Sequence, residues 1–116
     1  IKKVGERVSP ETLQNAINFI EENFDKNIVL KDVADAVNFS PVYFHKMFTS
    51  SLGITPHQYI LNKRLESAKT YLLTTSYSMN DIVEKCGFSS VSYFASTFKK
   101  NVGITPSEFR QKKYII

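Results

Sequence analysis

The sequence predicts an all-α protein made of two helix-turn-helix subdomains, about seven helices in total, joined by a long central helix. Helix start and stop signals punctuate the chain at short intervals, and apolar residues recur between them at helical spacing. No segment alternates convincingly as a strand. The pattern also repeats once along the 116 residues, at an offset of 49–50 positions.

The first helix is expected over residues 10–24, after a linker or tail at residues 1–9. Ser9 is a good N-cap, and Pro10 is tolerated at the first helical position. The apolar side chains that follow at helical spacing are Leu13, Ile17, Ile20 and Phe24. A shorter helix of about two turns should follow, with Leu30, Val33, Ala34 and Val37 on one face.

Ser40 and Pro41 start the third helix, which ends at Gly53 and turns Phe44, Met47 and Phe48 inward. The central helix should run from a capping box at residues 55–58 to about Leu73. Its apolar stripe consists of Leu61, Leu65, Ala68 and Leu72.

Three shorter helices complete the chain. One starts at the Ser78–Asp81 cap, and the next opens at Ser89-Ser90, buries Phe94 and Phe98, and ends at Gly103. A capping box at residues 105–108 opens the last helix, through about Lys112. These signals divide the chain into a tail (1–9), a first helix-turn-helix subdomain (10–55), a connecting helix (56–75) and a second helix-turn-helix subdomain (76–116).

Positive charge is concentrated in the repeated part of the chain. Residues 39–75 carry four basic residues and one acid, net +3, and residues 76–116 carry six and three, again net +3. Residues 1–38, with five and seven, are net −2. This distribution suits a polyanionic partner. A single cysteine, Cys86, is expected to be a small core residue, and no apolar run is long enough to span a bilayer.

The repeat gives two copies of one helix-turn-helix unit. Residues 44, 48 and 53–56 of the first copy match residues 94, 98 and 103–106 of the second. Asn38 and Gly87 occupy the turns, four residues after Ala34 and Val83, and both residue types tolerate the positive φ that a sharp turn between helices often needs. Phe39 and Phe88 should then return the chain to the core.

The chain resembles the DNA-binding domain of the AraC/XylS family of bacterial transcription regulators over residues 10–112. The second copy carries the more specific part of the resemblance, from Asp81 through Gly87-Phe88 and Gly103-Ile104-Thr105-Pro106 to Arg110. The resemblance implies two helix-turn-helix subdomains that bind adjacent major-groove segments of double-stranded DNA. A connecting helix of about 18 residues is roughly 27 Å long, which allows two recognition helices about one duplex turn apart.

By this resemblance, base reading in the first copy falls to Val42, His45 and Lys46. Lysine donates to guanine O6 and N7, histidine donates or accepts, and valine contacts a thymine methyl group. In the second copy the matching set is Val91, Ser92, Ala95 and Ser96. Because these side chains are short and uncharged, we expect the second copy to discriminate bases weakly and to dock through phosphates. The candidate backbone contacts are Ser40, Tyr43, Thr49, Ser89, Ser90, Tyr93, Lys99 and Lys100.

Lys63, Arg64 and Arg110 could also touch phosphate, but pairing with carbonyls or carboxylates is the expected role of both arginines. An enzyme is disfavoured, since no phosphate loop, nucleophile elbow or metal-ligand cluster is present, and we expect no cofactor. A helical protein-interaction module with a basic face for an acidic partner shares every core feature and stays open. RNA binding also stays open as an alternative function, although the narrow major groove of A-form RNA excludes such helices.

The resemblance further implies a cytoplasmic bacterial regulator that is associated with the nucleoid when bound. It implies RNA polymerase as a partner, and a sensing or dimerising domain that these residues do not contain. On this interpretation the fragment is a monomer when free.

Overall fold

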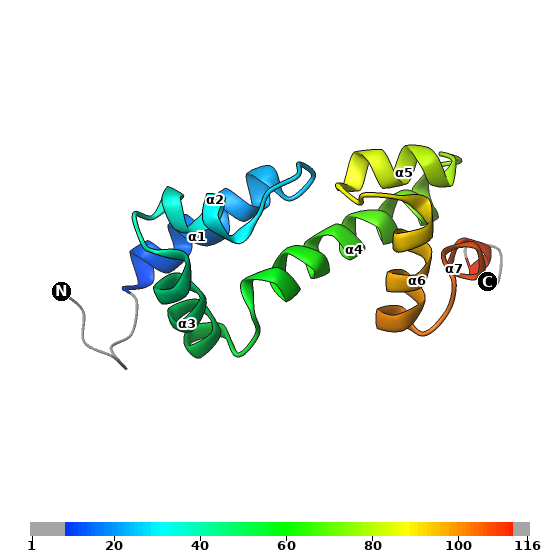
Figure 1. Cartoon of the computed structure of the whole chain (residues 1–116). Coiled ribbons are helices and arrows are strands. Elements are labelled where there is room, and N and C mark those ends of the chain that lie inside the picture. The colour runs from blue at the N-terminus through cyan, green and yellow to red at the C-terminus, as the bar shows by residue number, and fades with distance from the viewer. Residues whose placement is uncertain (1–8, 113–116) are drawn as a thin grey trace. The chain divides into compact units, whose positions relative to one another are not determined.

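The computed structural model describes residues 9–112, and these residues form seven helices and no strand (Figure 1). The helices are α1 (Pro10–Asn23), α2 (Leu30–Ala36), α3 (Pro41–Leu52), α4 (Pro56–Thr74), α5 (Met79–Cys86), α6 (Val91–Val102) and α7 (Pro106–Gln111). The predicted all-α class is therefore confirmed for the described part of the chain. The expected tail at residues 1–9 lies outside it, apart from Ser9.

Most helices begin at the capping residues that the sequence indicates. The side chains of Ser9, Ser40, Ser78 and Thr105 each accept a hydrogen bond from the backbone N–H three residues on. In the box that starts α7, the Thr105 N–H also donates to Glu108 Oε1 at 2.9 Å. These hydrogen bonds from Thr105 hold the pKa of Glu108 below its usual value. Side-chain caps therefore satisfy backbone donors that helix geometry leaves without partners.

One capping detail differs from the prediction, and at another helix the structure shows which of two predicted serines is the cap. At α4, Thr55 Oγ1 accepts from the Gln58 N–H at 3.1 Å, but the Gln58 side chain donates to Asn62 Oδ1 at 2.8 Å. A partner four residues further along the same helix face thus draws the Gln58 amide away from a reciprocal box. At α6 the N-cap is Ser90, whose Oγ accepts from the Tyr93 N–H at 3.0 Å, and Ser89 is not the cap.

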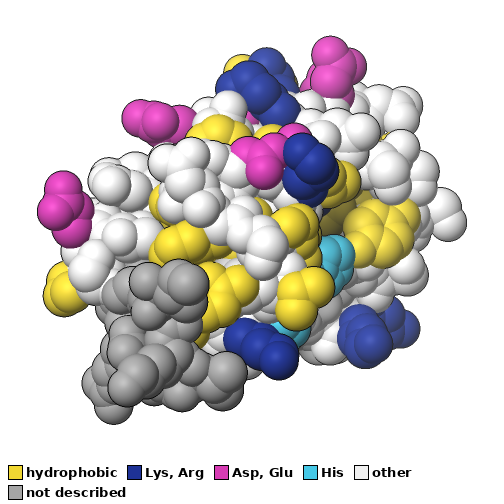
Figure 2. All heavy atoms as spheres, turned by 60° about the vertical axis from the view of Figure 1, so that its left-hand side comes forward, with side chains coloured by type: hydrophobic (Ala, Val, Ile, Leu, Met, Phe, Trp, Pro, Cys, Tyr) yellow, Lys and Arg dark blue, Asp and Glu magenta, His cyan; other side chains and the backbone are white. Residues whose placement is uncertain are grey.

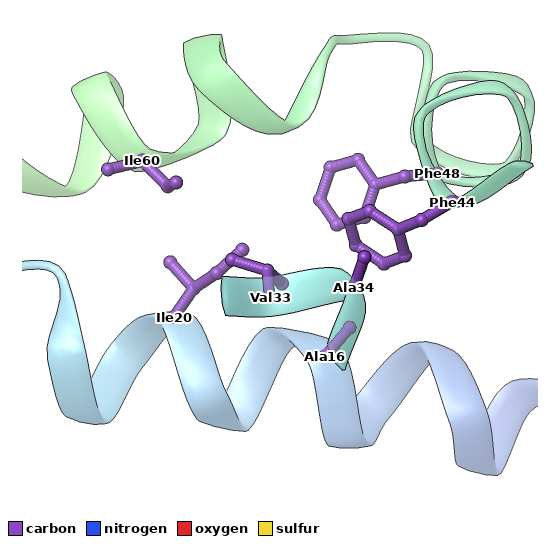
Figure 3. Packing of buried hydrophobic residues seen from close by; sticks show 7 residues of the cluster. All are labelled: Ala16, Ile20, Val33, Ala34, Phe44, Phe48 and Ile60. Carbon is purple, nitrogen blue, oxygen red and sulfur yellow. The ribbon is translucent and has the colours of Figure 1, made fainter. Parts of the chain in front are cut away.

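The chain divides into two compact units, Ile1–Asn62 and Lys63–Ile116, and the division falls inside α4. In the first unit, α1 packs on α2 and α2 on α3. Side chains from these three helices and from the start of α4 form one apolar cluster (Figure 3). Its buried members are Ala16, Ile20, Val33, Ala34, Phe44, Phe48 and Ile60.

The second unit is built in the same way from the rest of α4 and the last three helices. Helix α5 packs on α6 and α6 on α7. The predicted α4 stripe is buried, with Leu65, Ala68 and Leu72 in this unit, and Ile82, Cys86, Phe94 and Phe98 are fully buried. Cys86 lies in the core as expected, with its Sγ 3.5 Å from Ser67 Oγ. None of the helices in residues 9–112 is long and apolar enough to cross a membrane.

Arg110, on α7, closes the C-terminal end of α4. Its Nε donates to the Leu72 carbonyl at 3.2 Å, and its NH2 nitrogen donates to the Thr75 carbonyl at 3.3 Å. Carbonyls at the end of a helix have no partner within the helix and attract positive charge. The structural role expected for Arg110 is therefore confirmed.

Replacing Arg110 with alanine should lower the free energy of unfolding by about 1–3 kcal/mol, since two charge-assisted hydrogen bonds to partly buried carbonyls are lost. Urea denaturation of the full chain measures this change. Arg110→Lys, which keeps the charge but loses the planar pair of donors, should be intermediate. Unchanged stability of Arg110→Ala, together with weaker DNA binding, would instead assign Arg110 to phosphate.

Candidate nucleic-acid interface

Both helix-turn-helix turns have the conformation that the sequence predicts. Asn38 has φ 61° and is the only non-glycine residue with positive φ in the described part of the chain, while Gly87 has φ 86°. The Phe39 N–H donates to the Ala34 carbonyl at 3.0 Å, and the Phe88 N–H donates to the Val83 carbonyl at 3.0 Å. The same hydrogen bond therefore closes each turn and directs the chain into α3 or α6.

Helices α3 and α6, which we call the reading helices, have matching ends. Each contains 12 residues, begins after a serine N-cap, and ends at a glycine with a left-handed conformation. The Gly53 N–H donates to the Thr49 carbonyl at 2.8 Å, and the Gly103 N–H donates to the Lys99 carbonyl at 2.8 Å. Residue n of α3 thus corresponds to residue n + 50 of α6.

Aromatic packing fixes the inward face of each reading helix. The ring centroids of Phe44 and Phe48 are 5.4 Å apart, and those of Phe94 and Phe98 are 5.6 Å apart. Phe48 then meets Tyr59 edge-on at 5.6 Å, as Phe98 meets Phe109 at 5.5 Å. Because an i, i+4 pair is buried in both helices, the residues on the opposite side must face outward.

The three base-reading candidates of α3 lie on this outward side. Val42 is 69% exposed, the highest value among the large hydrophobic residues that the structure describes, and His45 and Lys46 are also exposed. On the face shown in Figure 2, Lys and Arg side chains lie beside a histidine in the lower part, and further Lys and Arg side chains lie among the acidic ones above. Val42, His45 and Lys46 thus place an apolar side chain, an imidazole ring and an ammonium group on neighbouring turns of α3.

Two backbone-contact candidates of α3 have their polar atoms inside the protein. Tyr43 and Thr49 are half-buried, and their hydroxyl oxygens are buried without a hydrogen-bond partner. The Tyr43 ring meets Phe39 edge-on at 5.1 Å. Neither hydroxyl can reach a phosphate in this conformation. The helical pattern could not indicate this, because both residues lie at the border of the buried face.

Helix α6 presents a different chemistry. Val91, Ser92 and Ser96 are exposed, whereas Ala95 is half-buried. The Ser96 hydroxyl donates to the Tyr93 carbonyl at 3.2 Å, and this local bond competes with any contact outside the protein. The backbone-contact candidates that lie at the surface of this copy are Ser89, Ser90, Tyr93, Lys99 and Lys100.

The lysines of the reading helices form no ion pair within residues 9–112, whereas some lysines elsewhere do. Lys31 lies 2.7 Å from Asp35, and the hydrogen bond to this carboxylate raises the pKa of Lys31. Within residues 9–112, no carboxylate lies within ion-pair distance of Lys46, Lys99 or Lys100. Nor does this part of the chain contain a group of three or more His, Cys, Asp or Glu residues that could hold a metal ion.

One exposed position was not among the predicted contacts. Ser50 lies at the surface of α3 and corresponds to Lys100 of α6. The register of the repeat was the available signal, since a position that carries a backbone-contact candidate in one copy is a candidate in the other. The two copies also differ in charge here, because Thr49 and Ser50 stand where α6 has Lys99 and Lys100.

Comparison with known proteins gives one consistent result. A family model described as a helix-turn-helix domain matches residues 33–112. The xylose operon regulatory protein of Escherichia coli K12 is 38% identical over 101 residues, which cover 87% of this chain and 26% of that protein. The chain spans less than half the length of the first curated relatives that it matches.

Solved structures agree with this family match. The C-terminal domain of the two-component response regulator yesN from Fusobacterium nucleatum has a TM-score of 0.84 and 36% identity, and the match covers 86% of this chain and 98% of that domain. A transcriptional regulator from Chromobacterium violaceum, described as an AraC-type DNA-binding domain-containing protein, has a TM-score of 0.81 and 34% identity. That match covers 89% of this chain and 92% of the other.

The turn at Asn38 can be tested by substitution. Asn38→Ala should lower the free energy of unfolding by about 1–2 kcal/mol, because alanine is strained at positive φ. Asn38→Gly should leave stability unchanged or raise it. Thermal or urea unfolding of the three proteins measures the difference, and Gly87→Ala compared with Gly87→Asn provides the matched pair in the second copy. Equal stability of the alanine and glycine variants at position 38 would contradict the argument.

Proposed function

This chain belongs to the AraC/XylS family of helix-turn-helix transcription regulators, and on that premise we propose that it binds double-stranded DNA with α3 and α6 in adjacent major-groove segments on one face of the duplex. One observation carries the proposal. The same helix-turn-helix occurs twice, with a residue of positive φ in the turn and a serine cap on the second helix, and the outer face of that second helix is free of acidic side chains in both copies. The proposed activity is binding without a chemical reaction. Residues 10–55 and 76–116 then act as two DNA-binding subdomains, and residues 56–75 connect them.

In the first copy, we assign direct base reading to Val42, His45 and Lys46. Their exposure supports this assignment, as does the absence of a carboxylate near Lys46 within the described residues. An unpaired ammonium group is free to donate to guanine O6 or N7, and an exposed valine at the start of a recognition helix is suited to a thymine methyl group. Ser40 supports phosphate binding from the first turn of α3, and Tyr43 and Thr49 could do so only after their side chains rotate.

In the second copy, we assign weak base contacts to Val91, Ser92, Ala95 and Ser96, and docking chiefly to phosphate contacts. Tyr93 is 42% exposed and offers its hydroxyl, while Lys99 and Lys100 offer two charges at the end of α6. Ser89 and Ser90 lie at the N-terminal end of the helix, where backbone amides attract phosphate. Contacts of this kind fix position on the duplex and carry little sequence information.

We further propose RNA polymerase as a partner, and a sensing or dimerising domain elsewhere in the full protein. The greater length of the relatives supports the second proposal. We also propose that the protein is cytoplasmic and associates with the nucleoid when it is bound to DNA. The competing function, a basic helical module for an acidic protein, predicts no preference for duplex DNA over single strands. A gel-shift experiment with both nucleic acids distinguishes the two functions.

Lys46→Ala should reduce the difference in binding free energy between specific and random sequence by about 1–3 kcal/mol in the DNA segment that α3 contacts, because a donor to a base edge is removed. Competition binding of specific against random duplexes measures the loss. His57→Ala is a suitable control, since His57 is exposed at the start of α4 and outside both reading helices. An equal loss on specific and random duplexes would show that Lys46 contacts only the backbone.

Binding should weaken steeply as salt is added. With about six phosphate contacts, the slope of log K against log salt concentration should be near −5, because each neutralised phosphate releases condensed counterions. Titration of a fluorescent duplex at several salt concentrations gives the slope. Lys99→Ala and Lys100→Ala should each make it less steep by about one, equally on all sequences. A slope near zero for the unmodified chain would remove DNA binding as its main function.

A further inference from the structure

We propose that the second unit carries a docking surface for an acidic, amphipathic segment of another protein, on the side of α6 that faces away from its outward residues. The surface consists of Lys69 and Leu73 on α4, Phe109 on α7 and Lys112 directly after α7, and we call it the α4–α7 surface. The inference goes beyond the proposed function, because this surface stays open while the reading helices contact a duplex.

Two lysine ammonium groups lie over one aromatic ring in the α4–α7 surface. Lys69 Nζ is 6.0 Å from the centroid of the Phe109 ring, and Lys112 Nζ is 5.7 Å from it, within the range at which a ring face attracts cations. Within residues 9–112, no carboxylate lies within ion-pair distance of either lysine. Glu66 and Glu108, the acids nearest in sequence, contact other residues. Two like charges are thus brought together, and an added anion would relieve their repulsion.

Apolar side chains adjoin these charges. Leu73 is 39% exposed and lies four residues after Lys69, on the same side of α4. Phe109 is half-buried, so part of its ring reaches the surface. Arg110 donates to two carbonyls at the end of α4 and so fixes α7 against this end of the helix. The apolar and the basic groups are therefore held together by the fold.

The α4–α7 surface lies behind α6. Phe98 points inward from α6 and is fully buried, and the Phe109 ring meets the Phe98 ring edge-on at 5.5 Å. In Figure 1, α7 lies beside α6, on which it packs. Because Lys69 and Lys112 lie over Phe109, they are placed beyond this layer of rings. A duplex on the outer face of α6 does not supply their anion.

The mixture of groups determines the chemistry of the partner. A purely acidic chain would satisfy the lysines and leave Leu73 in water, whereas an apolar chain would leave the two ammonium groups without an anion. A helix with an apolar stripe, flanked by glutamate or aspartate, provides apolar contact at the centre and opposite charge at the rim. Since the surface is small, we expect weak and reversible binding.

The experiment uses the full chain and a fluorescent synthetic peptide. The probe is a helix-forming peptide with leucines one turn apart and glutamates on both sides of that stripe. Two control peptides carry serine in place of leucine, or glutamine in place of glutamate. Fluorescence anisotropy gives the affinity of the free chain and of the chain saturated with duplex DNA. Physiological salt is used, because it screens charges that lie more than a Debye length apart.

The variant K69A/K112A should bind the probe about tenfold more weakly, because two ion pairs are lost. Leu73→Ser should weaken binding about fivefold through the loss of apolar contact. The variant K69R/K112R keeps both charges and should bind like the unmodified chain. The matched control K99A/K100A removes the same charge from α6 and should leave probe binding unchanged. Both control peptides should bind more weakly than the probe, and saturating duplex should change its affinity less than about twofold.

Circular dichroism and thermal unfolding establish that each variant is folded, and K69Q/K112Q, which keeps long side chains, replaces the alanine variant if that one unfolds. Absent probe binding would overturn the inference, as would equal weakening by K69A/K112A and K99A/K100A. Displacement of the probe by duplex, with a less steep salt dependence of duplex binding in K69A/K112A, would assign both lysines to phosphate and also overturn it. The free-chain measurements need no DNA, so a chain without salt-dependent duplex binding would defeat the proposed function alone.

Discussion

Burial of two phenylalanines one helical turn apart is the constraint on which the rest of the interface depends. Phe44 and Phe48 in α3, and Phe94 and Phe98 in α6, are each anchored by a further ring. A helix whose side chains are buried at two successive turns cannot rotate about its axis. The helical period then determines which of its residues face outward. Burial of a phenylalanine side chain contributes about 1.5–3 kcal/mol, far more than any single exposed residue of these helices can contribute to folding. The outward positions are consequently open to chemical variation.

Much of this organisation could be predicted from the sequence because it rests on local rules. Caps at Ser9, Ser40, Ser78 and Thr105, and positive φ at Asn38 and Gly87, involve residues within a few positions of one another. The duplication strengthens each rule, since an agreement found twice in register is harder to obtain by chance. Of the two adjacent serines before α6, however, only the backbone path decides that Ser90 is the cap.

Other features depend on neighbours that a linear pattern does not specify. The burial of the Tyr43 and Thr49 hydroxyls is set by packing at the border of the core, where helical periodicity gives no clear side. Gln58 turns to Asn62 because both lie on one face of α4, and this partner competes with the cap. The partial burial of Ala95 is of the same kind. In each case the surroundings of the side chain in the folded protein, and not the helical period, decide where it lies.

The contact between Arg110 and the end of α4 has a consequence for how the chain is made. The residues that complete the first unit end at Asn62, whereas the carbonyls of Leu72 and Thr75 receive their partner from α7, which is synthesised later. Because domains generally fold as units in order of synthesis, the first unit is free to fold while the second is still being translated. Closure of the second unit waits until α7 has emerged. Translation of α7 therefore sets the moment at which both reading helices first become available together.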